Sequence, residues 1–476
     1  MAVSQNESHG AYTMFTKTVE KVEKMAKQSK AIQAAGRGRR VNSFFAGIGG
    51  FDLAFERAGF MPAFYCEKDV FCRSVLKRHW PALPNAADVQ GLCPEDIPEA
   101  EVWTAGFPCQ DLSLARTPHG ARHGLNGSQS GLFFTFMALL SVHRPPVVLL
   151  ENVAGLLNSH KGEDFRTLIT SLTALGYAVA WRALNARYFG VPQSRPRIFI
   201  CAWRGSPSKA VQALFEDEIA AMPENERRGF EVESRCPDSG ISVSQVSFCI
   251  SATSGRHTGL DWARSYVTYP EAVRRLTPLE CERLQGLPDN WTVPDTDYVV
   301  PSRGIDTNRY HAVGNAVCVP VAEWIAGRIS SNLEREETAC SPTGEELSRQ
   351  LDQLARKFLS YPFTVQKLSG STDPVKWKSG GIACGGRFVT LPVSSSPVVP
   401  VVSRLIDVID KRDIHERYFL SSNAIKGILR RVDKLGRNLF PPLDAVLRRI
   451  CAPDGKSVRA RPVIRKRSSA KQAVAV

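Results

Sequence analysis

The sequence of 476 residues lacks the long apolar runs from which membrane-spanning helices are built. A helix that crosses a bilayer needs about 20 consecutive apolar residues, and no run here approaches that length. The first residues are polar and carry lysine, without the apolar segment of a secretory signal. We therefore expect no membrane contact and a cytoplasmic protein.

The sequence also lacks the cysteine and histidine spacings of metal sites and disulfide frameworks. Its 12 cysteines are scattered, no Cys-x-x-Cys pair occurs, and its 9 histidines form no cluster of zinc spacing. Free thiols in a reducing compartment account for this pattern. We therefore expect no metal.

Acidic residues are outnumbered, because 61 Lys and Arg stand against 47 Asp and Glu, which gives a formal net charge of +14 at pH 7. Such an excess suits a polyanionic partner such as nucleic acid. A basic surface that keeps the protein soluble explains it equally well. Charge alone therefore leaves the partner open.

Strand-like and helix-like segments alternate from Val41 to about Trp203, in a chain long enough for two or three domains. Apolar runs such as Val102–Ala105 and Val147–Leu150 predict buried strands. Strands that alternate with helices predict an α/β fold with a mostly parallel sheet covered on both faces. Helices are expected over 51–58, 132–142 and 165–175, from Thr277, and as a pair over 424–435 and after Pro441.

Other segments predict linkers and tails. Four lysines from Lys17 to Lys27 recur at helical spacing before a flexible basic linker, 36–40. The run Ser394–Pro397 has the composition of a linker, and the tail from Lys456 to Lys471 is basic and expected to be disordered.

One cysteine, Cys109, is placed to be chemically active. It lies in the sequence GFPCQ (106–110), where a glycine and a proline break an apolar strand and Asp111 is a candidate helix start. A helix N-terminus lowers the pKa of a thiol, and the thiolate is the nucleophilic form. A single cysteine is most often a small buried residue, so its role depends on the rest of the chain.

Further motifs accompany it in a fixed order. The set reads FAGIGGF (45–51), GFPCQ (106–110), ENV (151–153), QSRPR (193–197) and GNAV (314–317). In this order the chain resembles the DNA (cytosine-5) methyltransferase family of bacterial and phage type, over about Arg40 to Arg328. Each motif is weak evidence by itself, whereas the ordered set is specific.

The resemblance implies a Rossmann-like methyltransferase domain that uses S-adenosylmethionine. Independently of it, a glycine loop between strand and helix lets the backbone approach a nucleotide-like ligand, and an acid after the next strand suits a ribose. By resemblance, Phe45 stacks on the adenine, Glu67 binds the ribose hydroxyls and Asp88 accepts from the adenine amino group. The other cofactor residues that it implies are Ala46, Gly47, Gly49, Gly50 and Asn315.

The resemblance also implies covalent catalysis on a cytosine flipped out of its duplex. Cys109 is then the nucleophile that adds to C6, and Glu151 supplies a proton or hydrogen bond at N3. Arg197 contacts the ring carbonyl or Glu151, and Arg195 supports it. A phosphate contact or a solvated strand edge remains the alternative for the two arginines.

Sequence recognition maps by resemblance to a variable region over 205–271, with Arg256, His257 and Arg264 as base or phosphate contacts. The expected divisions are a basic appendage and linker (1–40), a catalytic cofactor-binding domain (41–204), the recognition region (205–271), the final motifs returning to the catalytic domain (272–330) and a C-terminal extension of unknown role (331–476).

The function implied is methylation of C5 of cytosine in a short double-stranded DNA sequence, in restriction-modification or phage self-protection. A monomer is expected, and a cognate restriction endonuclease stays open as a partner. Alternatives are the same chemistry on tRNA, or a non-catalytic DNA-binding protein on this scaffold. The terminal helix pair is either a DNA-binding helix-turn-helix or a packing element.

Overall fold

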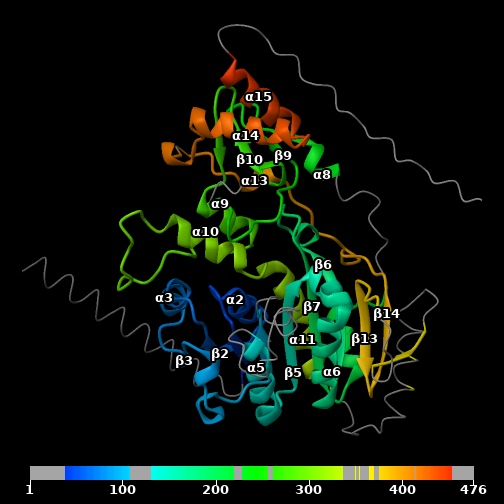
Figure 1. The fold of residues 1–476 in the computed structure, drawn as a ribbon. Coiled ribbons are helices and arrows are strands. Elements are labelled where there is room, and N and C mark those ends of the chain that lie inside the picture. The colour runs from blue at the N-terminus through cyan, green and yellow to red at the C-terminus, as the bar shows by residue number, and fades with distance from the viewer. Residues whose placement is uncertain are drawn as a thin grey trace, which may run out of the picture.

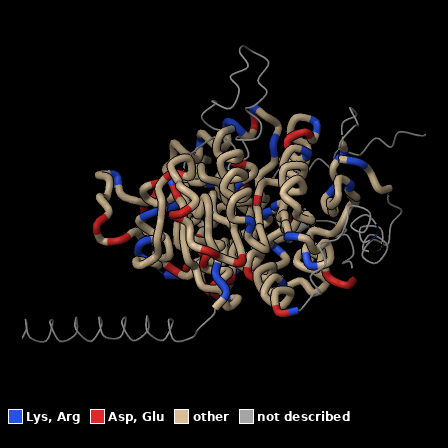
Figure 2. The backbone as a smooth tube through the Cα atoms, turned by 90° about the horizontal axis from the view of Figure 1, so that it is seen from below, with Lys and Arg blue, Asp and Glu red and all other residues tan. Residues whose placement is uncertain are grey.

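The computed structural model describes residues 38–107, 130–218, 228–255, 261–335, 349, 353, 364–368, 375–412 and 414–452. Figure 1 shows a lower part built on a large sheet and an upper part built on a small one, with α9 and α10 between them. Basic and acidic residues are interspersed along the backbone in Figure 2. Within the described residues, no helix combines the length and apolarity that a membrane span requires.

The large sheet contains ten strands among the described residues, in the order β12-β14-β13-β6-β7-β5-β4-β1-β2-β3. Pairing is parallel from β3 to β5 and antiparallel beyond it, so that seven of the ten strands run in one direction. This confirms the predicted α/β fold with a mostly parallel sheet. The strands are β1 (Arg40–Phe44), β2 (Met61–Cys66), β3 (Asn85–Ala86), β4 (Val102–Ala105), β5 (Val147–Val153), β6 (Tyr177–Asn185), β7 (Pro196–Arg204), β12 (Gln366–Lys367), β13 (Gly380–Cys384) and β14 (Arg387–Leu391).

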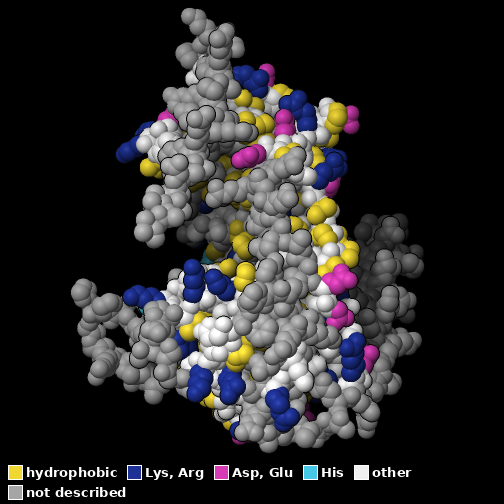
Figure 3. Space-filling model, turned by 90° about the vertical axis from the view of Figure 1, so that its right-hand side faces the viewer, with side chains coloured by type: hydrophobic (Ala, Val, Ile, Leu, Met, Phe, Trp, Pro, Cys, Tyr) yellow, Lys and Arg dark blue, Asp and Glu magenta, His cyan; other side chains and the backbone are white. Residues whose placement is uncertain are grey.

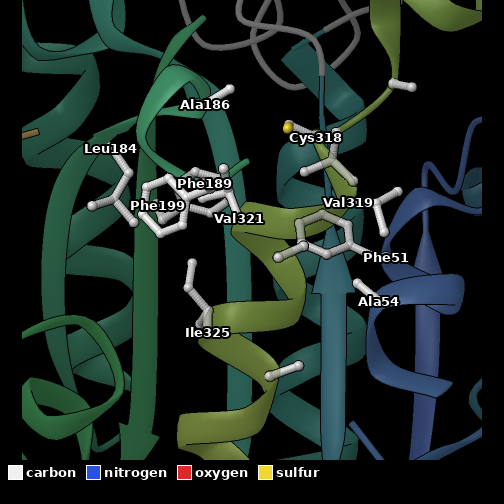
Figure 4. Close-up of a cluster of buried hydrophobic side chains, with 14 of the residues drawn as sticks. Phe51, Ala54, Leu184, Ala186, Phe189, Phe199, Cys318, Val319, Val321 and Ile325 are labelled. Carbon is white, nitrogen blue, oxygen red and sulfur yellow. The ribbon is translucent and has the colours of Figure 1, made fainter. Parts of the chain in front are cut away.

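Helices cover both faces of this sheet, as predicted. Successive residues of β5 point to opposite faces, so Val147 and Leu149 enter one apolar core and Val148 and Leu150 the other. The first core contains side chains of α2 (Gly50–Arg57), α3 (Val70–His79), α7 (Pro207–Leu214) and α11 (Val319–Glu334), and Figure 4 shows part of it around Phe51 and Ile325. The second contains side chains of α5 (Ser130–His143) and α6 (Glu163–Ala174).

The upper part, which we call the small-sheet lobe, combines two distant stretches of sequence. Its sheet has the order β11-β10-β9-β8 and is antiparallel throughout. Two C-terminal helices pack against it, and their apolar side chains form a third core with Tyr266 and Val273. The lobe is built from β8 (Glu233–Arg235), β9 (Ser242–Ser244), β10 (Tyr266–Thr268), β11 (Val273–Arg275), α14 (Ser422–Lys434) and α15 (Pro441–Cys451).

The remaining elements are short helices and 3-10 segments between those already named. The helices are α8 (Arg228–Glu231), α9 (Pro278–Leu284), α10 (Asp306–Asn315) and α13 (Leu405–Val408). Short 3-10 segments are η1 (Val89–Gly91), η2 (Pro94–Asp96), η4 (Ala154–Gly162), η5 (Ala186–Tyr188), η6 (Asp261–Ala263) and η7 (Glu416–Tyr418).

The predicted helix boundaries agree with local chemistry. The hydroxyl of Thr277 accepts from Glu280 N while the Glu280 carboxylate accepts from Thr277 N, which is a full capping box at the start of α9. Gly59 and Gly436 follow α2 and α14 with φ of 86° and 57°, values that favour glycine. The four lysines at helical spacing, Lys17 to Lys27, and the basic tail lie outside the described residues.

Two predicted linkers are wrong where the structure describes them. The side chain of Arg39 donates to Ser330 O at 2.8 Å, and Arg40 opens β1 instead of ending a flexible linker. Ser394 and Ser396 are buried. The guanidinium of Arg182 in β6 donates hydrogen bonds to their carbonyl oxygens at 3.3 and 2.6 Å and so holds this segment in place. Composition suggested a linker, but a buried arginine on a distant strand orders this segment.

The C-terminal extension therefore runs from one sheet to the other. Strand β13 pairs with β6, and a Cβ on Gly381 would lie 2.2 Å from the Trp181 ring, so the two strands pack closely. Further on, Leu405 N donates to Gln245 O at 2.8 Å, next to β9. The strap over 394–409 joins the edge of the large sheet to the small-sheet lobe.

Helix α7 lies inside the range 205–271 that we assigned to recognition, yet it packs on the large sheet. Its side chains Ala210, Val211 and Leu214 belong to the same core as α11. Ser206 caps it, accepting from Lys209 N.

Candidate functional site

The predicted glycine loop joins β1 to α2 and adopts a tight backbone. Phe45, Gly47 and Gly49 have φ of 52°, 57° and 80°, a region that non-glycine residues rarely adopt. A Cβ on Gly50 would lie 2.7 Å from a methyl carbon of Val317. The first motif thus packs directly against the last one, although more than 260 residues separate them.

Glu67 follows β2 and holds this loop with both carboxylate oxygens. Oε2 accepts from Gly47 N and Oε1 from Asp69 N, each at 2.7 Å. Burial raises the pKa of the Glu67 carboxyl. A carboxylate offers about four lone-pair positions, so Glu67 retains acceptors for two hydroxyl groups.

Asp88 follows β3 and is held as an anion. Its Oδ1 accepts from Gln90 N at 3.1 Å and its Oδ2 lies 2.9 Å from Lys68 Nζ. These two interactions hold the pKa of Asp88 below its ordinary value, the backbone hydrogen bond contributing most. The side chain is therefore a hydrogen-bond acceptor at neutral pH.

One cavity, of about 630 Å³, brings most of the predicted residues together. Its size falls within the range of small-molecule sites. The predicted residues that line it are Phe45, Gly47, Glu67, Asp88, Glu151, Arg195, Arg197 and Asn315. Ala46, Gly49 and Gly50 belong to the same loop but do not line it.

At one wall of the cavity Glu151 and Arg197 form an ion pair between neighbouring strands. Glu151 lies in β5 and Arg197 in β7, and Arg197 Nε is 3.1 Å from Glu151 Oε1. Burial raises the pKa of the Glu151 carboxyl, and the positive charges of Arg197 and Arg195 offset only part of that effect. Glu151 therefore retains its proton to a higher pH than an exposed glutamate.

Arg195 is buried, and its guanidinium donates hydrogen bonds to three backbone carbonyls. Its Nη1 donates to Ile250 O at 2.9 Å, and its Nη2 donates to Gly314 O and Ala316 O at 3.1 and 2.7 Å. It therefore ties the segment after β9 to the last motif, a role beyond the expected support of Arg197.

Cys109 lies outside the described residues, but the start of its loop is described. Strand β4 ends at Ala105, and Phe107 O accepts from Asn152 Nδ2 at 3.0 Å. The other end of the Asn152 amide, Oδ1, accepts from Val153 N at 2.9 Å. Asn152 therefore joins the base of the cysteine loop to the strand that carries Glu151.

Two of the three predicted DNA contacts, Arg256 and His257, also lie outside the described residues. Arg264 is half-buried, and its Nη2 donates to Thr253 O at 3.0 Å. This hydrogen bond links Thr253 to Arg264, and Arg256 and His257 lie between these two residues in sequence.

Sequence reasoning missed His311, which lines the cavity from α10. It lies four residues before Asn315, so both are on one face of the helix, and this spacing was an available signal. The apolar wall residue Leu132 was also missed, and no motif marks it.

Several known proteins are similar to this chain in sequence. The family model described as "C-5 cytosine-specific DNA methylase" matches residues 39–238 and 216–331. The type II methyltransferase M2.BsuMI of Bacillus subtilis (strain 168) is 31% identical over 321 residues, covering 61% of this chain and 75% of the relative. The type II methyltransferase M.NgoBI of Neisseria gonorrhoeae is 31% identical over 298 residues, covering 59% and 89%.

Solved structures align with a similar share of the chain. The S. pombe Dnmt2 methyltransferase shares 19% identity with a TM-score of 0.46, covering 63% of this chain and all of that one. A putative DNA modification methyltransferase from an E. coli prophage shares 18% identity with a TM-score of 0.42, covering 62% and 100%.

The two family-model matches together span residues 39 to 331, well over half of the chain. This protein therefore belongs to the C-5 cytosine-specific DNA methylase family.

Proposed function

We propose that the protein methylates C5 of cytosine within a specific short sequence of double-stranded DNA, with S-adenosylmethionine as methyl donor. The observation that carries this proposal is the single cavity that joins the Glu67 loop to the Glu151–Arg197 pair. A cofactor bound at the Glu67 loop and a substrate bound at the Glu151–Arg197 pair would lie in the same cavity. This proximity favours transfer of a group from one to the other.

The residues present fit S-adenosylmethionine. Glu67 has acceptors left for the ribose hydroxyls, and Asp88 is an anion able to accept from the adenine amino group. Phe45 and Gly47 line the same space. When bound, this cofactor supplies an electrophilic methyl group on a sulfonium.

Cys109 is the nucleophile in this proposal. Its thiolate adds to C6 of cytosine, and the electron pair of the C5–C6 bond moves to C5, which becomes reactive toward an electrophile. C5 would then form a bond to the methyl carbon of the cofactor as the bond from that carbon to the sulfonium breaks. Loss of the C5 proton to water expels the thiolate from C6, N3 returns its proton to Glu151, and the aromatic ring is restored. The Asn152–Phe107 hydrogen bond holds the base of the loop that carries this residue.

Glu151 holds the proton that the ring needs at N3. Negative charge develops on the ring as the thiolate adds, and Glu151, whose pKa burial raises, donates a proton to N3 at that moment. Arg197 orients Glu151 through the 3.1 Å contact between its Nε and Glu151 Oε1, and in this proposal it also contacts the ring carbonyl.

DNA is the proposed partner, bound between the two parts of the molecule. Figure 3 shows Lys and Arg side chains on the lower part of the face that it draws and on the part above it. A stacked base cannot reach a cavity lined from β2, β5 and α10, so the target cytosine is flipped out of the duplex. We assign recognition to the region 205–271, and a role in restriction-modification or phage self-protection follows from such sequence-specific methylation.

Bisulfite sequencing of plasmid DNA from bacteria that express the protein tests the proposal. Wild type is expected to protect cytosines in one short sequence context, and Cys109→Ser is expected to protect none. Cys93→Ser is the matched control, because Cys93 is exposed and does not line the cavity. Full protection by Cys109→Ser would refute the covalent step, and no protection by wild type would favour tRNA or a non-catalytic role.

A further inference from the structure

The helix pair α14–α15 is part of the small-sheet lobe, although it lies beyond residue 331, where the family match ends. The apolar faces of the two helices are buried against β10 and β11, with Ile428 and Leu447 fully inaccessible. The side of α14 that points away from this core is left to solvent.

Helix α14 lies beside the segment that we expect to face DNA. The guanidinium of Arg431 donates to Asp261 Oδ2 at 3.0 and 2.8 Å, and that of Arg437 lies 5.5 Å from the centre of the Trp262 ring. Asp261 and Trp262 lie four and five residues after His257 in sequence. At the other end of the same segment, Ile250 O binds Arg195 of the cavity.

The exposed face of α14 carries a basic stripe, which we define as Lys426, Arg430 and Lys434. The three residues are four apart, so they share one face of the helix, and all three are exposed. No ion pair joins any of them to another residue within the described parts of the chain.

The acidic residues of the helix pair do not neutralise this stripe. Residues 421–452 contain seven Lys and Arg against two Asp, and both Asp433 and Asp444 pair with Arg448. Like charges four residues apart destabilise a helix, so repulsion within the stripe lowers the stability of α14. A polyanion bound along this face would remove that repulsion.

We propose that the basic stripe binds phosphates of the DNA duplex next to the methylated site. This inference rests on the proposed function, because it needs duplex DNA as the substrate. Contacts of this kind position a protein on the duplex without reading its bases. They add affinity that falls as the salt concentration rises.

Binding of a long fluorescent duplex to the full-length protein tests the proposal, with salt varied between about 50 and 200 mM. Lys426→Glu/Arg430→Glu is compared with Lys367→Glu/Lys376→Glu, a matched control with the same charge change on exposed residues near β12 and β13. We expect the stripe variant to bind DNA about tenfold or more weakly than wild type. The slope of log affinity against log salt concentration should become shallower by about two, since each phosphate contact contributes about 0.9 to that slope. The control should bind like wild type.

The same proteins are compared in methyl transfer to a short duplex that covers only the recognised site, and in thermal unfolding. We expect the stripe variant to methylate the short duplex like wild type and to unfold at the same temperature. Equal affinity and equal salt slope for the stripe variant and wild type would overturn the inference while leaving the proposed function standing. A wild type that neither binds nor methylates duplex DNA would overturn both. Lys426→Ala/Arg430→Ala, which removes charge without reversing it, should give an intermediate loss.

Discussion

At the scale of single residues, the cavity depends on carboxyl groups whose proton affinities differ. Asp88 is held as an anion by Gln90 N and Lys68, whereas burial favours the protonated form of Glu151. Environments that push two carboxyl groups apart in pKa allow one to accept hydrogen bonds and the other to donate a proton.

Replacing Glu151 with glutamine should slow methyl transfer by about 10²- to 10⁴-fold, the usual contribution of a general acid. Glutamine keeps the shape of the side chain but has no proton to transfer to N3. Single-turnover transfer of labelled methyl groups measures the effect, with Glu56→Gln, an exposed glutamate of α2, as control. An unchanged rate in Glu151→Gln would remove this residue from the chemistry.

Asp52, at the start of α2, should make stability depend on pH. It is fully buried, and burial raises its pKa from 3.8 to about 7. The folded state therefore binds a proton that the unfolded state releases at lower pH. The free energy of unfolding should fall as pH rises from about 4 to about 7, by at most about 4 kcal/mol for about three pKa units.

Asp52→Asn removes this dependence, because an amide has no charge to bury. The variant should be more stable than wild type at pH 8, and the difference should shrink towards pH 5. Urea unfolding at both pH values measures it, with the exposed Asp238→Asn as control. A difference that does not change with pH would contradict the expectation.

At the scale of elements, the cavity is assembled by close backbone contacts between distant segments. Gly314 in α10 touches the segment after β9, because a Cβ there would lie 2.2 Å from Ala252 N and from Ser251 C. Backbone atoms cannot rotate away as a side chain can, so this position tolerates no side chain without a shift of the whole helix.

Gly314→Ala should therefore lower the free energy of unfolding by about 1–3 kcal/mol. Gly327 in α11 is the matched control, because a Cβ there would meet no atom within 4 Å. Gly327→Ala should be neutral or stabilise by up to about 1 kcal/mol, since alanine is the better helix former. If chemical denaturation gave the same decrease in the free energy of unfolding for both variants, the close contact of Gly314 with Ser251 and Ala252 would not be the cause.

Sequence reasoning succeeded for elements with local signals and failed for long-range contacts. The capping box at Thr277, the glycines that follow helices and the motif loops all depend on residues a few positions apart, so the sequence predicted them. The insertion of β7 between β5 and β6, and the pairing of β13 with β6, join segments that have no shared local pattern. The same holds for Ser394 and Ser396, whose burial is due to Arg182 more than 200 residues earlier.

At the scale of the whole molecule, the C-terminal extension protects an edge of the large sheet. All nine residues of β6 are buried, and without β13 its backbone would be open to pairing with another chain. A chain that ends at Arg335 should therefore aggregate, whereas one that ends at Arg404 keeps β12–β14 and should still bind S-adenosylmethionine. Size-exclusion chromatography and calorimetry of both chains test this, and a monomeric, cofactor-binding short chain would refute it.

The third core has a consequence for synthesis of the protein. The last residue of the cavity, Asn315, leaves the ribosome before α14, and the small sheet ends at Arg275, long before the helices that cover it begin at Ser422. Domains generally fold as they emerge, from the N-terminal end onward. The small-sheet lobe is thus completed last. A nascent chain passes through a stage in which all residues of the cavity have been synthesised while the small sheet is still uncovered.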